Sequence, residues 1–132
     1  MSRIRSKDTK PEMVVRKALF AAGFRYRLHQ KSLPGKPDIV LKKYNTVILI
    51  HGCFWHGHDN CKYFIVPKTR TEWWLEKINR NRTIDHNSIK ALRKLGWNVL
   101  VIYECELKSK MLYGNINKII FAIIQDHNDY AS

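Results

Sequence analysis

The stretch Val47-Ile48-Leu49-Ile50-His51-Gly52-Cys53-Phe54-Trp55-His56-Gly57-His58-Asp59-Asn60-Cys61 decides how this chain folds. It begins with four consecutive apolar residues, a pattern that predicts a buried strand. The next eleven residues contain three histidines, two cysteines and two large aromatic side chains. Neither a buried strand end nor a flexible loop requires that mixture. We therefore expect a rigid strand that carries a loop of metal-binding and aromatic side chains to one end of a sheet.

The residues before this stretch predict a helix and two further strands. Thr9 and Glu12 stand at the spacing of a capping box, just before an apolar stripe of helical period. Large and basic residues then alternate, as in a half-exposed strand. The expected elements are a helix that begins after Thr9 and ends at Gly23, a strand over Phe24–His29, a strand over Asp38–Leu41 headed by an acid, a hairpin connection over Lys42–Asn45, and the strand at 46–50.

The residues after the stretch predict two more helices and one more strand. The whole order is helix, three strands, loop, helix, strand, helix, which indicates an α/β sandwich around a short mixed sheet. The expected elements are a helix capped by Thr69 or Thr71 and running through Ile78, a polar stretch over 79–87 that is helical only in part, renewed helical spacing up to Leu95, a buried strand over 97–103, and a helix over about 112–125 whose isoleucine stripe packs in the core.

Length and composition exclude several classes of protein. The chain has 132 residues, which suits one domain, and residues 1–8 are polar and basic, as in a flexible arm. No apolar run is long enough for a membrane span, and the charged start is not followed by the apolar segment of a secretory signal. We therefore expect a cytoplasmic protein.

The charge is the first indication of function. Lys and Arg number 24 against 11 Asp and Glu, which gives a formal net charge of +13 and a pI near 9.9. Such a balance attracts polyanions, of which nucleic acid is the commonest in the cytosol. The alternative is a basic surface that serves solubility alone.

Three soft or borderline ligands fall within nine residues, at Cys53, His58 and Cys61. Cys105, at the end of a predicted strand, can supply a fourth and pin the loop to the sheet. Four such ligands suit a closed, tetrahedral structural zinc site. An odd number of cysteines argues against a disulfide framework, whereas buried inert thiols are the alternative to zinc.

Asp38 is a candidate for a second kind of metal site. If its strand pairs antiparallel with the next, Asp38 lies near the backbone of Ile50 and the ring of His51. A carboxylate, a main-chain carbonyl and waters form an octahedral magnesium site, and such an ion can activate a water against a phosphate. Taken alone, an Asp before a strand is more often a turn residue.

Several segments, in the same order, resemble the very short patch repair (Vsr) DNA mismatch endonucleases. The resemblance covers about residues 3–107 and is carried by Lys7–Glu12, Gly23–His29, Leu33–Asp38, His51–His56, Arg70–Ile78 and Gly96–Cys105. It implies a restriction-endonuclease-like three-layer sandwich, here one nuclease domain over 1–132. It also implies a nick on the 5′ side of the thymine in a T:G mismatch, formed when 5-methylcytosine deaminates.

The resemblance also implies a role for individual residues. Asp38 matches the essential metal-binding acid, and the backbone carbonyl of Ile50 a second magnesium ligand. His56 matches the general base, and Asp85 the acid that holds its ring. The remaining matches are His51 where the wider nuclease superfamily has a lysine, Glu12 at the water shell of the metal, Asn81 near phosphate, and Cys53, His58, Cys61 and Cys105 as the zinc ligands.

Three aromatic residues, Phe54, Trp55 and Trp74, resemble the family's wedge that enters the DNA stack beside the mismatch. A mismatched step unstacks at a lower cost than a paired one, and aromatic faces replace the lost stacking. The alternative is that these side chains belong to the core.

The leading hypothesis is a magnesium-dependent, zinc-stabilised nicking endonuclease of bacterial DNA repair that acts at the nucleoid as a monomer. Its partners would be double-stranded DNA with a T:G mismatch and a mismatch-repair ATPase. Two alternatives remain open: a related nicking nuclease of different site specificity, and a non-catalytic, zinc-containing DNA-binding module.

Overall fold

The computed structural model describes residues 10–58, 61–62, 64–107 and 112–131. Within them the helices and strands follow the expected order, and they confirm an α/β protein with a mixed sheet. The arm expected at residues 1–8 and the cap expected at Thr9 lie outside the described residues.

Four strands form one sheet in the order β1-β2-β3-β4. They are β1 (Arg27–Leu28), β2 (Ile39–Leu41), β3 (Thr46–His51) and β4 (Asn98–Tyr103). Strand β2 pairs antiparallel with β1 and with β3, whereas β3 and β4 are parallel. A single turn of 3-10 helix, Lys42–Tyr44, therefore suffices between β2 and β3, which confirms the hairpin. The parallel strand β4 is reached only through a long helix.

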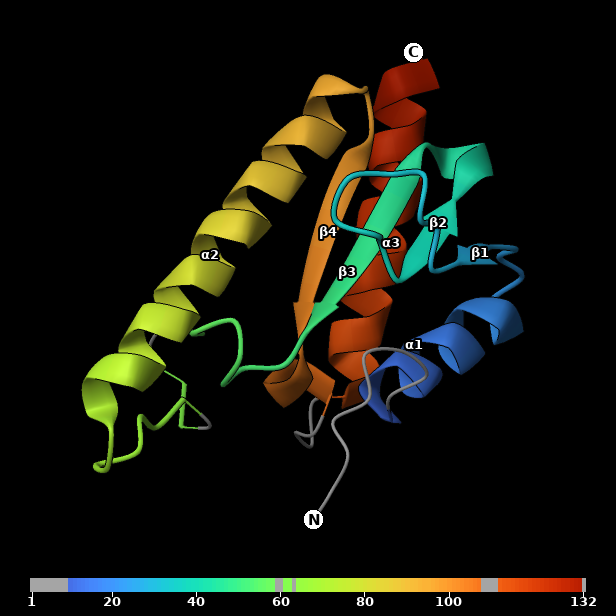
Figure 1. Ribbon diagram of the computed structural model, residues 1–132. Helices are drawn as coiled ribbons and strands as arrows, with labels where there is room; N and C mark the ends of the chain where they lie inside the picture. Colours follow the sequence, from blue (N-terminus) through green and yellow to red (C-terminus); the bar gives the residue numbers. More distant parts are fainter. Residues whose placement is uncertain (1–9, 59–60, 63, 108–111, 132) are drawn as a thin grey trace.

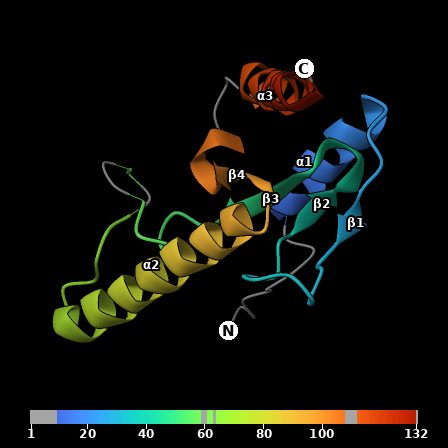
Figure 2. The same ribbon diagram turned by 90° about the horizontal axis from the view of Figure 1, so that it is seen from above.

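Helices cover both faces of this sheet. Helices α1 (Lys10–Ala21) and α3 (Leu112–Ala131) lie on one face, and α2 (Thr71–Lys94) lies on the other (Figure 1). The view from above separates the three layers and shows that one end of α2 extends past the sheet (Figure 2). None of the helices in the described part of the chain has the length and apolar character that a membrane span requires.

Two buried clusters hold the layers together, because successive strand residues point to opposite faces. Ile39, Leu41 and Ile48 face α1 and α3. Val40 and Val47 face α2 and pack against Leu92. The isoleucine stripe of α3 joins the first cluster as predicted, through Ile116, Ile119, Ile120 and Ile123, but Ile124 is 42% exposed.

Helix α2 departs most from the sequence-based prediction. The polar stretch 79–87, expected to be helical only in part, is helical throughout, so that prediction was wrong. Ile78 is fully buried within this helix, and Asn81 and Asp85 hydrogen-bond to the loop that follows β3. Contacts with the loop therefore stabilise a segment whose sequence has little amphipathic pattern of its own.

Smaller differences have local causes. Neither Thr69 nor Thr71 caps α2: the cap is Arg70, in the left-handed region at φ 57, and the Thr71 hydroxyl donates instead to the carbonyls of Pro67 and Lys68. The strand expected over 24–29 is confined to β1. Strand β4, expected to be buried, is mostly half-buried because it forms one edge of the sheet.

The fold brings the last residues of β3 and β4 and the residue before β2 to the same end of the sheet, here called its carboxyl end. His51 at the end of β3 pairs with Tyr103 at the end of β4. Because β2 runs antiparallel to β3, Asp38, which precedes β2, also lies at the carboxyl end of the sheet. The carboxyl ends of parallel strands are the usual position of a binding crevice in an α/β sheet.

Candidate active site

A cleft of about 600 Å³ opens at the carboxyl end of the sheet. It is lined by residues from all layers, including Asp38, His51, His56, Asp85 and Glu104. The only Lys or Arg side chain among the described residues that line it is Lys36. Three carboxylates and a single lysine would repel an anionic substrate. Such a cleft therefore suits an anionic substrate only if a metal cation binds there as well.

The first group of ligand-type side chains in this region, here called the acid group, consists of Glu12, His29 and Asp38. One ligand atom of each lies within 4.8 Å of the others. Glu12 is only 1% exposed, and its two carboxylate oxygens contact Arg16 at 3.1 Å and His29 at 2.9 Å. Glu12 therefore has tertiary contacts whether or not it also belongs to a capping box.

The pKa of Asp38 is raised to about 6, chiefly by burial and also by the neighbouring Glu12 carboxylate, while the hydrogen bond from the Ile50 backbone opposes the shift. Two carboxylates that share a buried site repel each other, so such a site favours either a proton or a cation. This is the electrostatic environment in which a divalent ion binds.

The backbone of Ile50 completes the surroundings of Asp38. The amide N–H of Ile50 donates to Oδ2 of Asp38 at 2.8 Å. The N–H and C=O of one strand residue lie on the same edge of the strand, so the Ile50 carbonyl also faces the Asp38 side. A carboxylate and a carbonyl on one edge are oxygen ligands of the kind that magnesium prefers. The donor set therefore fits the ion expected from the sequence.

The second group, here called the histidine group, consists of His51, His56 and Asp85. Nδ1 of His56 lies 2.5 Å from Oδ2 of Asp85. Because an ionised carboxylate can only accept, an imidazole in this position that carries one hydrogen has it on Nδ1, and its Nε2 carries the lone pair. The geometry leaves His56 able to accept a proton.

His51 packs face to face on His56, with ring centroids 3.9 Å apart and an interplanar angle of 5°. The pKa of His51 is lowered to about 4, chiefly by burial and also by the nearby His56. His51 is therefore neutral at neutral pH. A proton accepted by His56 then meets no second positive charge on the ring stacked against it.

The third group, here called the thiol group, consists of Cys53, His58, Cys61 and Cys105, whose ligand atoms also lie within 4.8 Å of one another. Sγ of Cys105 lies 3.5 Å from Nδ1 of His58, and Sγ of Cys53 accepts from the Cys105 amide at 3.4 Å. Bonds of about 2.3 Å from zinc to sulfur, at tetrahedral angles, separate neighbouring ligands by roughly 3.8 Å. The four side chains fit a closed zinc site.

The thiols also need a cation to ionise. The pKa of Cys105 is raised to about 12, chiefly by burial and also by the neighbouring thiols of Cys53 and Cys61. Burial raises the pKa of Cys53 as well. Since zinc binds thiolates, a bound ion would reverse these shifts and release protons. The two cysteines of the loop and the one beyond β4 are thereby suited to a structural metal.

Helix α2 holds the loop from the other side. Asn81 donates to the Trp55 carbonyl at 2.9 Å, and Arg82 donates to the Gly57 carbonyl at 2.5 Å. Gly57 is buried at φ +58, and a Cβ there would collide with Ile78 and with the Arg82 guanidinium. Close approach of the loop to α2 therefore requires glycine at this position.

Tyr103 connects the thiol group with the histidine group. Its ring stacks on His58 at a centroid distance of 3.8 Å and meets the His51 ring edge-on at 5.7 Å. His51 in turn stacks on His56. A continuous series of ring contacts thus runs from the proposed zinc ligand to the proposed base.

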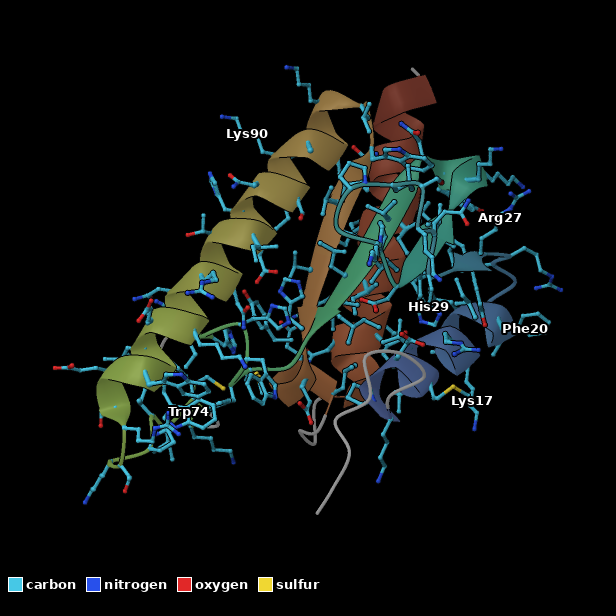
Figure 3. All side chains as sticks on the ribbon, in the orientation of Figure 1. Lys17, Phe20, Arg27, His29, Trp74 and Lys90 are labelled. Atoms are coloured by element: carbon cyan, nitrogen blue, oxygen red, sulfur yellow. The ribbon has the colours of Figure 1, made fainter. Side chains whose placement is uncertain are left out.

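An aromatic cluster lies beyond the histidine group, at the end of α2 that extends past the sheet. Trp74, which Figure 3 shows at that end, packs against Phe54 at 5.5 Å and Trp55 at 5.9 Å between ring centroids. Trp73 packs edge-on against Trp74 and is 43% exposed. Lys77 lies over the rings of both Trp55 and Trp73. Exposed aromatic faces next to cations are typical of nucleic-acid contact surfaces.

The structure brings together most of the side chains that the sequence indicated. The acid, histidine and thiol groups each form, and Asn81, expected near phosphate, hydrogen-bonds to the loop. Sequence reasoning missed four residues. Lys36, Trp73, His29 and Tyr103 all stood inside segments that carry the family resemblance, but no pattern distinguished them from their neighbours. Only the pairing of strands shows that His29 lies beside Asp38.

Comparisons with known proteins agree with one another. Residues 1–62 match the family model described as DNA mismatch endonuclease Vsr. The chain is 54% identical over 112 residues to the type II nicking enzyme V.NmeAIP of Neisseria meningitidis serogroup A, covering 85% of this chain and 79% of that protein. It is 46% identical over 110 residues to the DNA mismatch endonuclease Vsr of Escherichia coli K12, covering 83% and 70% respectively.

Proposed function

We propose a reaction for this chain on one premise: it belongs to the DNA mismatch endonuclease Vsr family and is a nicking DNA endonuclease. Its membership confirms the resemblance found in the sequence. The finer proposal is that it nicks the strand 5′ of the thymine in a T:G mismatch, in repair of deaminated 5-methylcytosine, and that its three layers follow the restriction-endonuclease-like arrangement.

The proposed catalytic metal site is the acid group together with the Ile50 carbonyl. Asp38 would hold the ion directly, and Glu12 would bind waters of its coordination shell. The bound magnesium would stabilise the charge that develops on the scissile phosphate. The raised pKa of Asp38 and the Ile50 contact at 2.8 Å support this assignment.

His56 is the proposed general base, and its contact with Asp85 is the observation that carries the proposal. Nε2 takes a proton from the attacking water, whose oxygen forms a bond to phosphorus. The bond from phosphorus to the leaving sugar oxygen breaks, and that oxygen takes up a proton from water. Asp85, 2.5 Å from Nδ1, keeps the required tautomer and stabilises the imidazolium that forms. His51, neutral and stacked on His56, supports the ring and the phosphate.

DNA recognition is assigned to the aromatic cluster and the basic surface. Phe54, Trp55 and Trp74 form the proposed wedge, and Trp73 extends its exposed side. The net charge of +13 attracts the duplex, and Lys36 is placed to contact a phosphate inside the cleft. A zinc ion in the thiol group would fix the loop that carries both wedge and base.

The test is a nicking assay on three duplexes of identical sequence that carry T:G, T:A or C:G at one position, with magnesium and zinc-loaded protein. We expect a nick 5′ of the thymine in the T:G duplex alone. An intact T:G strand in every sequence context would overturn the proposal. Equal nicking of T:A would remove the mismatch specificity.

A second candidate is a nicking nuclease whose site differs in its flanking bases. The names of two relatives favour it: V.NmeAIP, and V.XorIIP of Xanthomonas oryzae, 48% identical over 107 residues, are both called type II nicking enzymes. A panel of T:G duplexes with varied flanking pairs separates the two candidates. Addition of a purified mismatch-repair ATPase to the same assay tests the proposed partner through a change in rate.

A further inference from the structure

Glu12 is a buried carboxylate whose two oxygens have different partners. Oε2 contacts Nη1 of Arg16, one turn further along α1, at 3.1 Å. Oε1 contacts Nε2 of His29 at 2.9 Å. A buried carboxylate is costly unless it is paired and hydrogen-bonded. The His29 contact is one of the bonds that tie Glu12 to the sheet.

His29 is also bonded to the segment that carries the other acid. Its amide N–H donates to the Asp38 carbonyl at 3.2 Å. Its backbone lies in the left-handed region at φ 48, which is uncommon for residues other than glycine. Figure 3 shows its side chain between the sheet and α1. One residue thus fixes the relative positions of Glu12 and Asp38 through two bonds.

We propose, on the basis of the function proposed above, that His29 is a positioning residue for the catalytic metal ion. It donates from Nε2 to Glu12 and so holds that carboxylate beside Asp38, in the orientation that binds the water shell of the ion. Groups that orient metal-binding side chains in this way typically set the affinity for the ion by about 10–100-fold.

A role for His29 as a direct ligand fits the geometry less well. Its Nε2 is already engaged by Glu12 at 2.9 Å. Magnesium prefers oxygen donors, and imidazole suits softer ions. A carboxylate oxygen that accepts one hydrogen bond keeps a second lone pair, so Glu12 can accept from His29 and from a metal-bound water together.

The test measures the binding of Mn²⁺ alone, as a paramagnetic substitute for magnesium, to the zinc-loaded chain by electron paramagnetic resonance. His29→Asn tolerates the left-handed backbone but is too short to reach Glu12. We expect it to weaken Mn²⁺ binding by about 10–100-fold with zinc content unchanged. His29→Gln, which restores an amide donor at similar reach, should recover most of the affinity. His86→Ala, at an exposed histidine of α2, is the control.

A double-mutant cycle shows whether His29 acts through Glu12. In a Glu12→Gln background, His29→Asn should change the Mn²⁺ affinity by less than about threefold, since the contact is already altered. Undiminished affinity in His29→Asn, no recovery in His29→Gln, or a full effect of His29→Asn in the Glu12→Gln background would each overturn the inference. A wild-type chain that binds no Mn²⁺ and nicks no duplex would instead overturn the proposed function.

Discussion

The thiol group and the acid group both lie near the carboxyl end of the sheet, but they are assembled from different parts of the chain. Three of the four members of the thiol group fall within nine consecutive residues, from Cys53 to Cys61. The members of the acid group come from α1, from the residue after β1 and from the residue before β2. The first group is local in sequence, and the second exists only after the sheet has formed.

This difference determines what each metal would contribute. The acid group is held in place by protein contacts alone, at Glu12, His29 and the Ile50 amide. Burial and the neighbouring thiols raise the pKa of Cys105, and Cys53 is the one fully buried apolar side chain among the described residues of the loop. A zinc ion would therefore contribute folding energy to the loop, whereas magnesium would bind a site that is already formed.

The largest expected effect follows from Cys53→Ser, which removes a buried side chain of the proposed zinc site. The loop carries the proposed base, and loss of a positioned general base typically costs about 10²–10⁴-fold in rate. We expect zinc content below one per chain, a shift in tryptophan fluorescence from the cluster of Trp55 and Trp74, and a loss of nicking in that range. Magnesium removal from the wild-type chain, by contrast, should leave the fluorescence unchanged. If the zinc-free protein nicked DNA at the rate of the zinc-loaded protein, the proposed structural role of zinc would be contradicted.

Tyr103→Leu tests the connection between the two metal-related groups. Loss of the ring contacts with His58 and His51 frees the histidine group to shift, and a displacement of about 1 Å can cost roughly 10²-fold in rate. We expect zinc to remain bound while kcat falls and KM changes little. Tyr103→Phe, which keeps the ring, is the matched control. Equal rates for Leu and Phe would show that the ring contacts do not position His51.

The affinity of the acid group for Mn²⁺ should depend on pH. Asp38 would bind the ion as a carboxylate, and its pKa is raised to about 6, chiefly by burial. Below that pH a proton must leave for each ion bound, so Mn²⁺ affinity should fall by about tenfold per pH unit, and it should be nearly constant above it. Calorimetry over about pH 4.5–8 measures the profile. An affinity that keeps rising well above pH 6 would point to another titrating ligand.

The smallest expected effect concerns Lys36, the one lysine or arginine among the described residues that line the cleft. Lys36→Gln should reduce the slope of log affinity for duplex DNA against log salt by about 0.9, the value of one phosphate contact. Lys90→Gln is the matched control, because Lys90 points away from the body of the molecule at the other end of α2 (Figure 3). A reduction of the same size in both variants would show that Lys36 does not contact a phosphate in the cleft.

The two groups also show what the sequence can and cannot predict. The thiol group was predictable because cysteines and histidines at short spacing have few other uses in such a loop. Asp38 and its neighbour Ile50 followed from the expected antiparallel pairing of two strands. The general-base pair of His56 and Asp85 required the family resemblance, since 29 residues separate them in the chain.

His29 and the continuous helix α2 were not predictable for a shared physical reason. The role of His29 depends on a bond to Glu12, which lies 17 residues away on another layer. The polar part of α2 is helical because Asn81 and Arg82 bind a loop from 25 or 26 residues earlier. Local propensity is a weak guide wherever such long-range contacts contribute the stability.

The most direct test of the division between a structural and a catalytic metal site is Asp38→Asn, with zinc content, melting temperature and nicking of the T:G duplex measured on one sample. The pKa of Asp38 is raised from 3.8 to about 6, so its ionisation costs stability as pH rises through that window, and at about pH 7.5 the whole cost is present. Asparagine still accepts from Ile50 but carries no charge. We predict full zinc content, a higher melting temperature without magnesium, and no nicking. Nicking at the wild-type rate, or loss of zinc together with activity, would contradict the account.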